Sequence, residues 1–303
     1  MPVQTKTIKA RIKSVGNIKK ITRAMEMVAA SKMRKSTDKA LATREYWHLA
    51  LEILANIASQ QVIDHPLVRK TTGDRSLMVI ISSNKGLCGG YNVNLFRAID
   101  KYLSENKNEK FDFITIGKYA EKFARKKEGQ IIGSFVEFSD DLEMSEISGL
   151  KKMVIDEFVG PKYKRVKMAY THYVSAMNSL PRVHQLLPID PKKLQTIVDE
   201  LVFQGDGDQA KKIDKKSLSY YLFEPDEEGV VSKVLPTLTG IRLYQSLLDG
   251  AASEHSSRMM AMRSATDSAN EMEEELTLSF NQARQAAITQ EISEIAAGAQ
   301  ALS

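Results

Sequence analysis

The most suggestive chemistry in this sequence lies in a glycine-rich stretch, Lys85 to Gly90, which reads Lys-Gly-Leu-Cys-Gly-Gly. It follows an apolar run of strand length and precedes an amphipathic segment, where many nucleotide-binding folds hold a phosphate group. The glycine spacing fits neither the dinucleotide fingerprint nor the Walker A loop. Glycines can also allow a tight turn that packs close to a neighbouring segment. A tight turn is therefore the favoured interpretation, and a phosphate site is the alternative.

Other residues capable of chemistry do not combine into a site. Cys88 is the single cysteine, which excludes an internal disulfide and a cysteine-rich zinc site, and no histidine lies near it in the sequence to activate a thiolate. The histidines show no metal-ligand spacing, and the acidic residues near position 273 are typical of a solvated helix face. We therefore predict no catalytic residue, no metal site and no cofactor. The residues considered are His48, His65, His172, His184, His255, Glu271, Glu273, Glu274 and Glu275.

The elements around the glycine-rich stretch alternate between strand and helix patterns. Alternation in this order implies right-handed crossovers and a mostly parallel, Rossmann-like sheet. The pattern predicts strands over 77–82, 111–116, 131–135, 166–173 and 182–187, and helices over 93–103, 119–127 and 145–158, with a turn over 178–181.

Proline placement separates this middle region from the two ends of the chain. None of the eight prolines falls between Val3 and His65 or between Thr237 and Ser303. Because proline inside a helix costs ~3 kcal/mol, both ends are free to be helical. Apolar residues recur at spacings of three and four in both segments, so the two helices should pair antiparallel as a long coiled coil. We predict domains at 1–65 (N-terminal helix), 66–205 (α/β domain), 206–236 (connector) and 237–303 (C-terminal helix).

Two apolar stripes define the expected seam between these helices. His255, which falls on the second stripe, should be a packed core residue. The first stripe is Ile8, Ile12, Val15, Ile18, Met25 and Val28. The second is Ile241, Tyr244, Leu248, Ala252, His255, Met259, Met262, Thr266, Ala269, Met272, Leu276, Phe280, Ala283 and Ala287, and Ile292 and Ile295 extend it.

The charge distribution is uneven although the formal net charge is only +5. Residues 1–40 hold eleven Lys or Arg and only two acidic residues, Glu26 and Asp38. Such a segment expects an acidic partner (protein, nucleic acid or lipid headgroup) or is a solvated helix face. No run approaches the ~18 apolar residues of a transmembrane helix, and residues 1–30 lack the apolar core of a secretory signal.

Several motifs are more specific than their periodicity. Residues 21–34 (Ile-Thr-Arg-Ala-Met-Glu-Met-Val-Ala-Ala-Ser-Lys-Met-Arg) and 283–292 (Ala-Arg-Gln-Ala-Ala-Ile-Thr-Gln-Glu-Ile) resemble the N- and C-terminal signatures of the gamma subunit of F-type ATP synthases. Residues 85–92, 221–225 and 253–262 are also similar to that family, in family order. The match spans nearly the whole chain, although residues 100–210 match by pattern only.

This resemblance implies a function. The paired terminal helices would form the central stalk inside a ring of alpha and beta subunits. The α/β domain would sit with the epsilon subunit on the membrane c-ring. Proton flow would turn the c-ring and the stalk, and ATP chemistry would take place on beta. No nucleic-acid partner is expected, and the chain would associate with the membrane only through the complex.

The resemblance also implies three groups of contact residues. In the first, Arg284 and Gln285 should hydrogen-bond a loop of the open catalytic subunit, with Thr289 and Glu291 as neighbours in that contact. The second group should meet the acidic lever segment of beta and consists of Met25, Lys32, Arg34 and Lys35. The third should touch the polar loops of the c-ring and consists of Tyr221 and Glu224.

Chloroplast relatives carry an inserted cysteine pair for redox control, which a chain with Cys88 alone cannot form. The absence of a separable presequence favours the cytoplasmic face of a bacterial inner membrane over a mitochondrial matrix. Two alternative functions remain open from the residues alone. One is a nucleic-acid-binding coiled coil, and the other is a nucleotide-dependent enzyme built on the inserted sheet.

Overall fold

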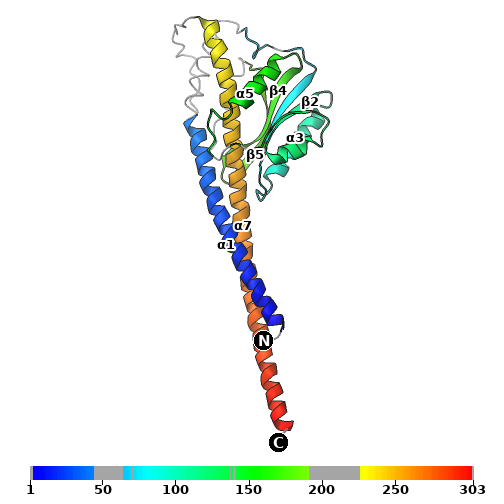
Figure 1. Ribbon diagram of the computed structural model, residues 1–303, viewed down its shortest axis with the longest axis vertical. Helices are drawn as coiled ribbons and strands as arrows, with labels where there is room; N and C mark the ends of the chain where they lie inside the picture. Colours follow the sequence, from blue (N-terminus) through cyan, green and yellow to red (C-terminus); the bar gives the residue numbers. More distant parts are fainter. Residues whose placement is uncertain are drawn as a thin grey trace. The chain divides into compact units, whose positions relative to one another are not determined.

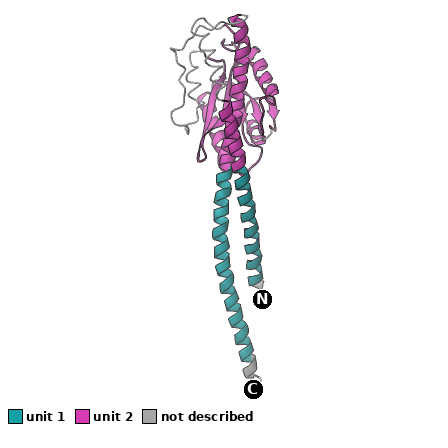
Figure 2. Cartoon of the chain, turned by 90° about the vertical axis from the view of Figure 1, so that its left-hand side faces the viewer, with its two compact units in different colours: residues 1–29, 258–303 teal, residues 30–257 magenta. Residues whose placement is uncertain are grey.

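The computed structural model describes residues 3–43, 64–69, 71–136, 138, 141–190 and 226–301. These residues form two compact units, coloured separately in Figure 2. Unit 1 comprises residues 1–29 and 258–303, and unit 2 comprises residues 30–257. Two long helices, α1 (Val3–Ala42) and α7 (Glu227–Ala301), contribute residues to both units.

Unit 2 is built on a five-stranded sheet with the order β3-β2-β1-β4-β5. The strands are β1 (Arg75–Ile81), β2 (Lys110–Ile116), β3 (Ile131–Phe135), β4 (Tyr163–Ser175) and β5 (Asn178–Leu187). Strands β1 to β4 pair in parallel with one another, and β5 is antiparallel to β4. The mostly parallel, Rossmann-like sheet is therefore confirmed (Figure 1).

The hairpin between β4 and β5 differs from the sequence prediction. We predicted a turn over 178–181, but residue 178 already pairs with Ser175, and Pro181 lies in β5 opposite Thr171. Proline has no N–H to donate, so it is tolerated where a strand lies at the edge of a sheet. In the described sheet β5 is such an edge.

Helices cover both faces of this sheet. Alternate residues of β1 point to opposite sides: Met78 and Ile80 lie in one apolar cluster with α3 (Tyr91–Glu105) and α4 (Lys118–Ala124). Leu77 and Val79 lie in the other, with α5 (Ser148–Val159) and α7. Burial on both faces explains why β1 is a continuous apolar run in the sequence.

Helix α7 begins earlier than the sequence predicted. Proline placement put its start after Pro236, but the helix begins at Glu227 and contains Pro236. The carboxylate of Asp226 accepts a hydrogen bond of 2.6 Å from the N–H of Gly229, so it caps the first turn. Leu235 and Leu238 on either side of the proline are buried in the core, and this packing offsets the lost helical hydrogen bond. Residues 227–236 are thus helical rather than part of a connector. Residues 44–63 of the predicted N-terminal rod, and 206–225 of the connector, lie outside the described residues.

In unit 1 the two helical segments run antiparallel, as predicted. Lys19 forms an ion pair of 3.0 Å with Glu273, and the hydroxyl oxygens of Thr22 and Thr266 lie 2.8 Å apart. The partner of residue 19 is therefore farther along α7 than the partner of residue 22. Figure 2 shows the two segments side by side, with α7 continuing past the N-terminal end of α1.

The seam of this helix pair is more polar than the predicted stripe. Ile8, Ile12 and Val15 are half-buried as expected, but Ile18 and Val28 are more than half exposed. The neighbouring residues Lys19, Thr22 and Ala29 take the inward positions instead. On α7 the stripe holds at Met262, Thr266 and Ala269, whereas Met272 is exposed and Glu273 lies inward. His255, in unit 2, is half-buried.

Candidate functional site

The glycine-rich stretch forms a tight turn packed against α7. Leu87 and Gly89 adopt left-handed backbone conformations, with φ of 60° and 55°. The carbonyl of Cys88 accepts a hydrogen bond of 2.6 Å from the hydroxyl of Ser257. The Cys88 thiol is buried and lies 3.5 Å from the side-chain amide nitrogen of Asn92. These contacts support the tight-turn interpretation, and burial of the thiol argues against a nucleophile.

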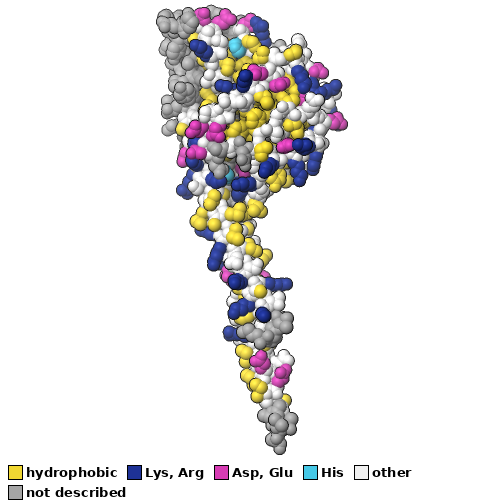
Figure 3. Space-filling view, in the orientation of Figure 1, with side chains coloured by type: hydrophobic (Ala, Val, Ile, Leu, Met, Phe, Trp, Pro, Cys, Tyr) yellow, Lys and Arg dark blue, Asp and Glu magenta, His cyan; other side chains and the backbone are white. Residues whose placement is uncertain are grey.

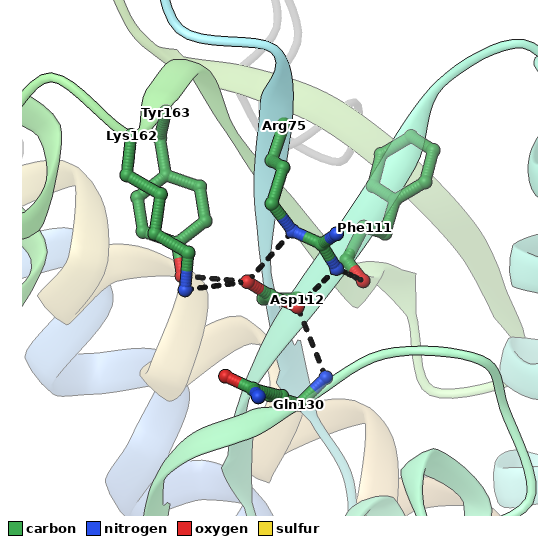
Figure 4. Close-up of polar contacts among 6 residues, drawn as sticks. All are labelled: Arg75, Phe111, Asp112, Gln130, Lys162 and Tyr163. Atoms are coloured by element: carbon green, nitrogen blue, oxygen red, sulfur yellow. Dashed lines mark hydrogen bonds and ion pairs between the residues drawn. The ribbon is translucent and has the colours of Figure 1, made fainter.

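An ionic cluster that the sequence did not reveal lies near the amino ends of β1 and β2 (Figure 4). The fully buried carboxylate of Asp112 accepts hydrogen bonds from Arg75 (2.5 and 3.0 Å), Lys162 (2.9 Å), the Tyr163 hydroxyl (2.9 Å) and the backbone N–H of Gln130 (3.0 Å). Burial opposes ionisation, but these donors outweigh it and hold the pKa of Asp112 well below its usual range. The cluster joins β1, β2 and the start of β4, so its role is to fix the sheet.

A second perturbed group, His184, lies on β5 beside the ring of Tyr170, with 5.4 Å between ring centroids. Burial, followed by the positive charges of Arg242 and Arg182, lowers the pKa of His184 to about 3. The ring is therefore neutral in the folded chain at pH 7.

This shift predicts a measurable acid sensitivity. A folded pKa below the unfolded value means that the unfolded state binds more protons, so stability falls as pH drops below about 6.5. Between pH 6.5 and 5 we expect His184 to cost about 1.5 kcal/mol of unfolding free energy. Urea unfolding measures the decrease in unfolding free energy between these two pH values. In His184→Gln this decrease should be about 1.5 kcal/mol smaller than in the unsubstituted chain. An equal loss in both proteins would contradict the assignment.

The candidate interaction site lies on the exposed surfaces of α1 and α7. In unit 1, Arg284, Gln285, Thr289 and Glu291 are all exposed. Helical spacing places Gln285 and Thr289 on one side of the helix, and Arg284 and Glu291 on another. The Thr289 hydroxyl donates to the carbonyl of Gln285 over 3.0 Å, so its oxygen is held close to the helix. All four predicted contact residues are therefore accessible, on two different sides of α7.

The residues predicted to meet the acidic lever segment are less uniform. Met25 is half-buried in unit 1, and Lys32 is half-buried in unit 2, where Arg34 is exposed. Lys35 already has an acidic partner, because its ammonium lies 2.9 Å from the carboxylate of Asp141. Any acidic segment that binds Lys35 must therefore compete with Asp141. Tyr221 and Glu224 lie outside the described residues.

Sequence reasoning missed a set of exposed apolar residues on the same helices. Ile18, Ile21, Met27 and Val28 of α1 are 51–59% exposed. On α7, Met272, Leu278, Ile288, Ile292 and Ile295 are 48–72% exposed. Apolar side chains this dense on a two-helix unit mark a surface that a partner covers. The available signal was that several of them fall outside the predicted stripes. Figure 3 shows such side chains in yellow along these helices, between Lys and Arg in dark blue.

In the part of the chain that the structure describes, no helix has the length and apolar character needed to span a membrane. The same described residues include no group of three or more His, Cys, Asp or Glu side chains arranged to hold a metal ion.

Comparison with known proteins identifies the family. The model of the family described as ATP synthase matches residues 4–302. The chain is 37% identical over 299 residues to the ATP synthase gamma chain of Stenotrophomonas maltophilia (strain R551-3), with 97% of this chain and 98% of the relative covered. The chain belongs to the ATP synthase gamma chain family. A more distant member from Roseiflexus sp. (strain RS-1) is 34% identical, with 98% of both chains covered.

Solved structures share the fold of this chain. A chain of the Euglena gracilis mitochondrial ATP synthase rotor (rotational state 1) aligns with a TM-score of 0.62 at 16% identity, covering 94% of this chain and 99% of that one. A chain of the Tetrahymena thermophila mitochondrial ATP synthase central stalk and c-ring aligns with a TM-score of 0.57 at 24% identity, covering 81% and 99%. Membership of the gamma-chain family makes this protein a non-catalytic subunit. The family supports neither the nucleic-acid-binding coiled coil nor the nucleotide-dependent enzyme that the residues alone left open.

Proposed function

We propose that this chain is the central-stalk rotor subunit of a proton-translocating F-type ATP synthase. Its near full-length match to gamma chains is the observation that carries the proposal. The partners are the alpha and beta subunits, the epsilon subunit and the c-ring. The chain has no active site of its own, and nucleotide chemistry takes place on beta. As a peripheral subunit it works at the cytoplasmic face of a bacterial inner membrane.

The surface of unit 1 suits a rotor because its two helices differ in charge. Residues 1–29 contain seven Lys or Arg and one acidic residue, whereas residues 258–303 contain three Lys or Arg and seven Asp or Glu. A surrounding ring of three like subunits therefore meets a different charge in each direction. Differential contact of this kind shifts each catalytic subunit toward a different conformation.

The contact residues follow from the exposed faces. Arg284 and Gln285, with Thr289 and Glu291 beside them, bind a polar loop of the open catalytic subunit. Met25, Lys32, Arg34 and Lys35 meet an acidic segment of beta, where opposite charges steer the encounter. Tyr221 and Glu224 contact the c-ring. The exposed apolar residues of unit 1 face the ring, since burial of that surface on assembly is favourable.

Assembly tests this function directly. Purified chain mixed with matching alpha and beta subunits should elute as one complex, and ATP hydrolysis by the complex should exceed that of alpha and beta alone. A complex of alpha and beta mixed with heat-denatured chain is the control. If the native chain neither co-elutes nor changes turnover, the rotor assignment is wrong.

A further inference from the structure

The segment of α7 in unit 2 is buried on every side from Leu238 to Gly250. Most of these side chains are apolar, but Arg242, Gln245, Ser246 and Asp249 are polar and no more than 5% exposed. Apolar contact is non-directional, so it defines the angle of a helix about its own axis less sharply than directional bonds do. Hydrogen bonds are directional and can fix that angle. Where these polar groups are anchored therefore matters for a helix that carries torque.

The strongest anchor joins α7 to the strand β4. Nδ1 of His172 lies 2.7 Å from the Oδ2 atom of Asp249, and both side chains are at most 3% exposed. Rotating α7 about its axis by the angle of one residue would move Asp249 by about 100°. The buried side chains of His172 and Asp249 would then lose their hydrogen bond to each other. Separating such a pair inside a protein is strongly disfavoured, because the carboxylate loses a partner that water cannot replace.

Three serines extend this anchor along the same face of α7. Ser253 donates to the carbonyl of Thr171 over 3.1 Å, and Ser256 donates to the carbonyl of Ala176 beyond the end of β4. Ser257 donates to the carbonyl of Cys88 in the tight turn. Together with Asp249, the serines follow the spacing i, i+4, i+7 and i+8, which places them on one side of a helix.

A second set of bonds holds α7 to different elements. The hydroxyl of Tyr244 donates to the carbonyl of Leu142 over 2.9 Å. The side-chain amide of Gln245 donates to the carbonyl of Ala40 (3.3 Å) and to the hydroxyl of Thr43 (3.0 Å). The helix is thus tied by directional contacts to a strand, a turn, the loop before α5 and the end of α1. Rotation about its axis must break several of them at once.

We infer that the Asp249–His172 pair and the Ser253 hydroxyl are positioning residues that lock the rotation angle of α7 in the α/β domain. The lock transmits torque between this domain and the C-terminal helix. This inference rests on the proposed rotor function. Because α7 continues as one helix to Ala301, an angle fixed at residues 249–253 is carried along its backbone. Without the lock, α7 would twist elastically within the domain before it turned the stalk.

The test uses the assembled complex, with alpha and beta fixed to a surface and a probe on the α/β domain. Angular fluctuations of the probe during a catalytic pause report the torsional stiffness between the ring and that domain. In Asp249→Ala we expect the variance of the angle to rise at least about twofold, with ATP hydrolysis by the complex unchanged, since the chemistry lies on beta. Ser253→Ala should raise it in the same direction.

Matched variants separate the lock from general damage. Ser232 is also a serine of α7, but it bonds only within the helix, to the carbonyl of Gly229. Ser232→Ala should therefore leave the variance unchanged. The double variant His172→Gln with Asp249→Asn, which can keep a neutral hydrogen bond across the same gap, should restore much of the stiffness.

The outcomes are distinguishable. If the unsubstituted chain fails to assemble, the rotor function itself is wrong. If it assembles and rotates, but Asp249→Ala and Ser253→Ala leave the variance unchanged, only the lock is overturned. Should Asp249→Ala fail to fold, Ser253→Ala decides alone, because it removes one hydroxyl and creates no buried charge.

Discussion

Replacing Asp112 with alanine should lower the free energy of unfolding by about 3–5 kcal/mol, because its removal leaves the partly buried guanidinium of Arg75 and the buried hydroxyl of Tyr163 without their acceptor. Arg75, Lys162 and Tyr163 all direct donors at this carboxylate, and its side chain is fully buried. Urea unfolding followed by circular dichroism measures the loss.

Two controls make this result specific. Asp100 forms a surface ion pair of 2.6 Å with Lys127 and is half exposed, so Asp100→Ala should cost less than about 1 kcal/mol. The folded pKa of Asp112 is lowered, so its stabilisation is present above the unfolded value of about 3.9 and is lost as pH falls below it. The difference between the unsubstituted chain and Asp112→Ala should therefore be constant above about pH 5 and shrink below about pH 4. Equal losses for Asp112→Ala and Asp100→Ala would contradict the structural role.

Replacing both Arg284 and Gln285 with alanine should reduce ATP turnover by the assembled complex at least about tenfold. Each polar contact with a catalytic subunit contributes on the order of 1 kcal/mol, and about 1.4 kcal/mol corresponds to a tenfold change in rate. Both residues are exposed on α7, so the stability of the isolated chain should stay within about 0.5 kcal/mol of the unsubstituted value.

Gln282 supplies the matched control for this experiment. It is exposed on the same helix, but it is not among the predicted contact residues. Gln282→Ala should keep turnover within about twofold of the unsubstituted complex. A double variant that retains full turnover, or a control that loses as much, would show that the loop contact lies elsewhere on α7.

The sheet could be predicted because its strands are short apolar runs buried on both faces. β1 contributes Met78 to one core and Val79 to the other, and burial on both sides produces an unbroken apolar run. The ends of the strands were harder to predict. β4 begins at Tyr163 and not at the predicted residue 166. Its first residues were missed because the mixed polar residues there show no clear periodicity. The predicted start of α7 after Pro236 is wrong, because packing of Leu235 and Leu238 in the core overrides the low helix propensity of proline.

The contacts that give the molecule its polar interior could not be predicted. Asp112 gathers donors from three other parts of the chain, up to 51 residues away, and no local spacing encodes that meeting. The seam of unit 1 was misplaced at Ile18 and Val28 for a related reason. A stripe of apolar residues predicts burial, but here Thr22 and Lys19 lie inward and leave apolar side chains outside. The motif resemblance indicated the contact residues, whose role in assembly stays a prediction.

The end of α7 has a consequence for how a cell must make this protein. From Ile288 to Ala297 every residue is exposed, and Ile288, Ile292 and Ile295 share one face. A short helical segment without tertiary packing is only marginally stable in water. Its exposed isoleucine stripe can associate with another copy of the chain as well as with the ring. A newly synthesised copy without ring subunits is thus an aggregation hazard. Co-expression with alpha and beta is therefore a condition for obtaining this chain without aggregation.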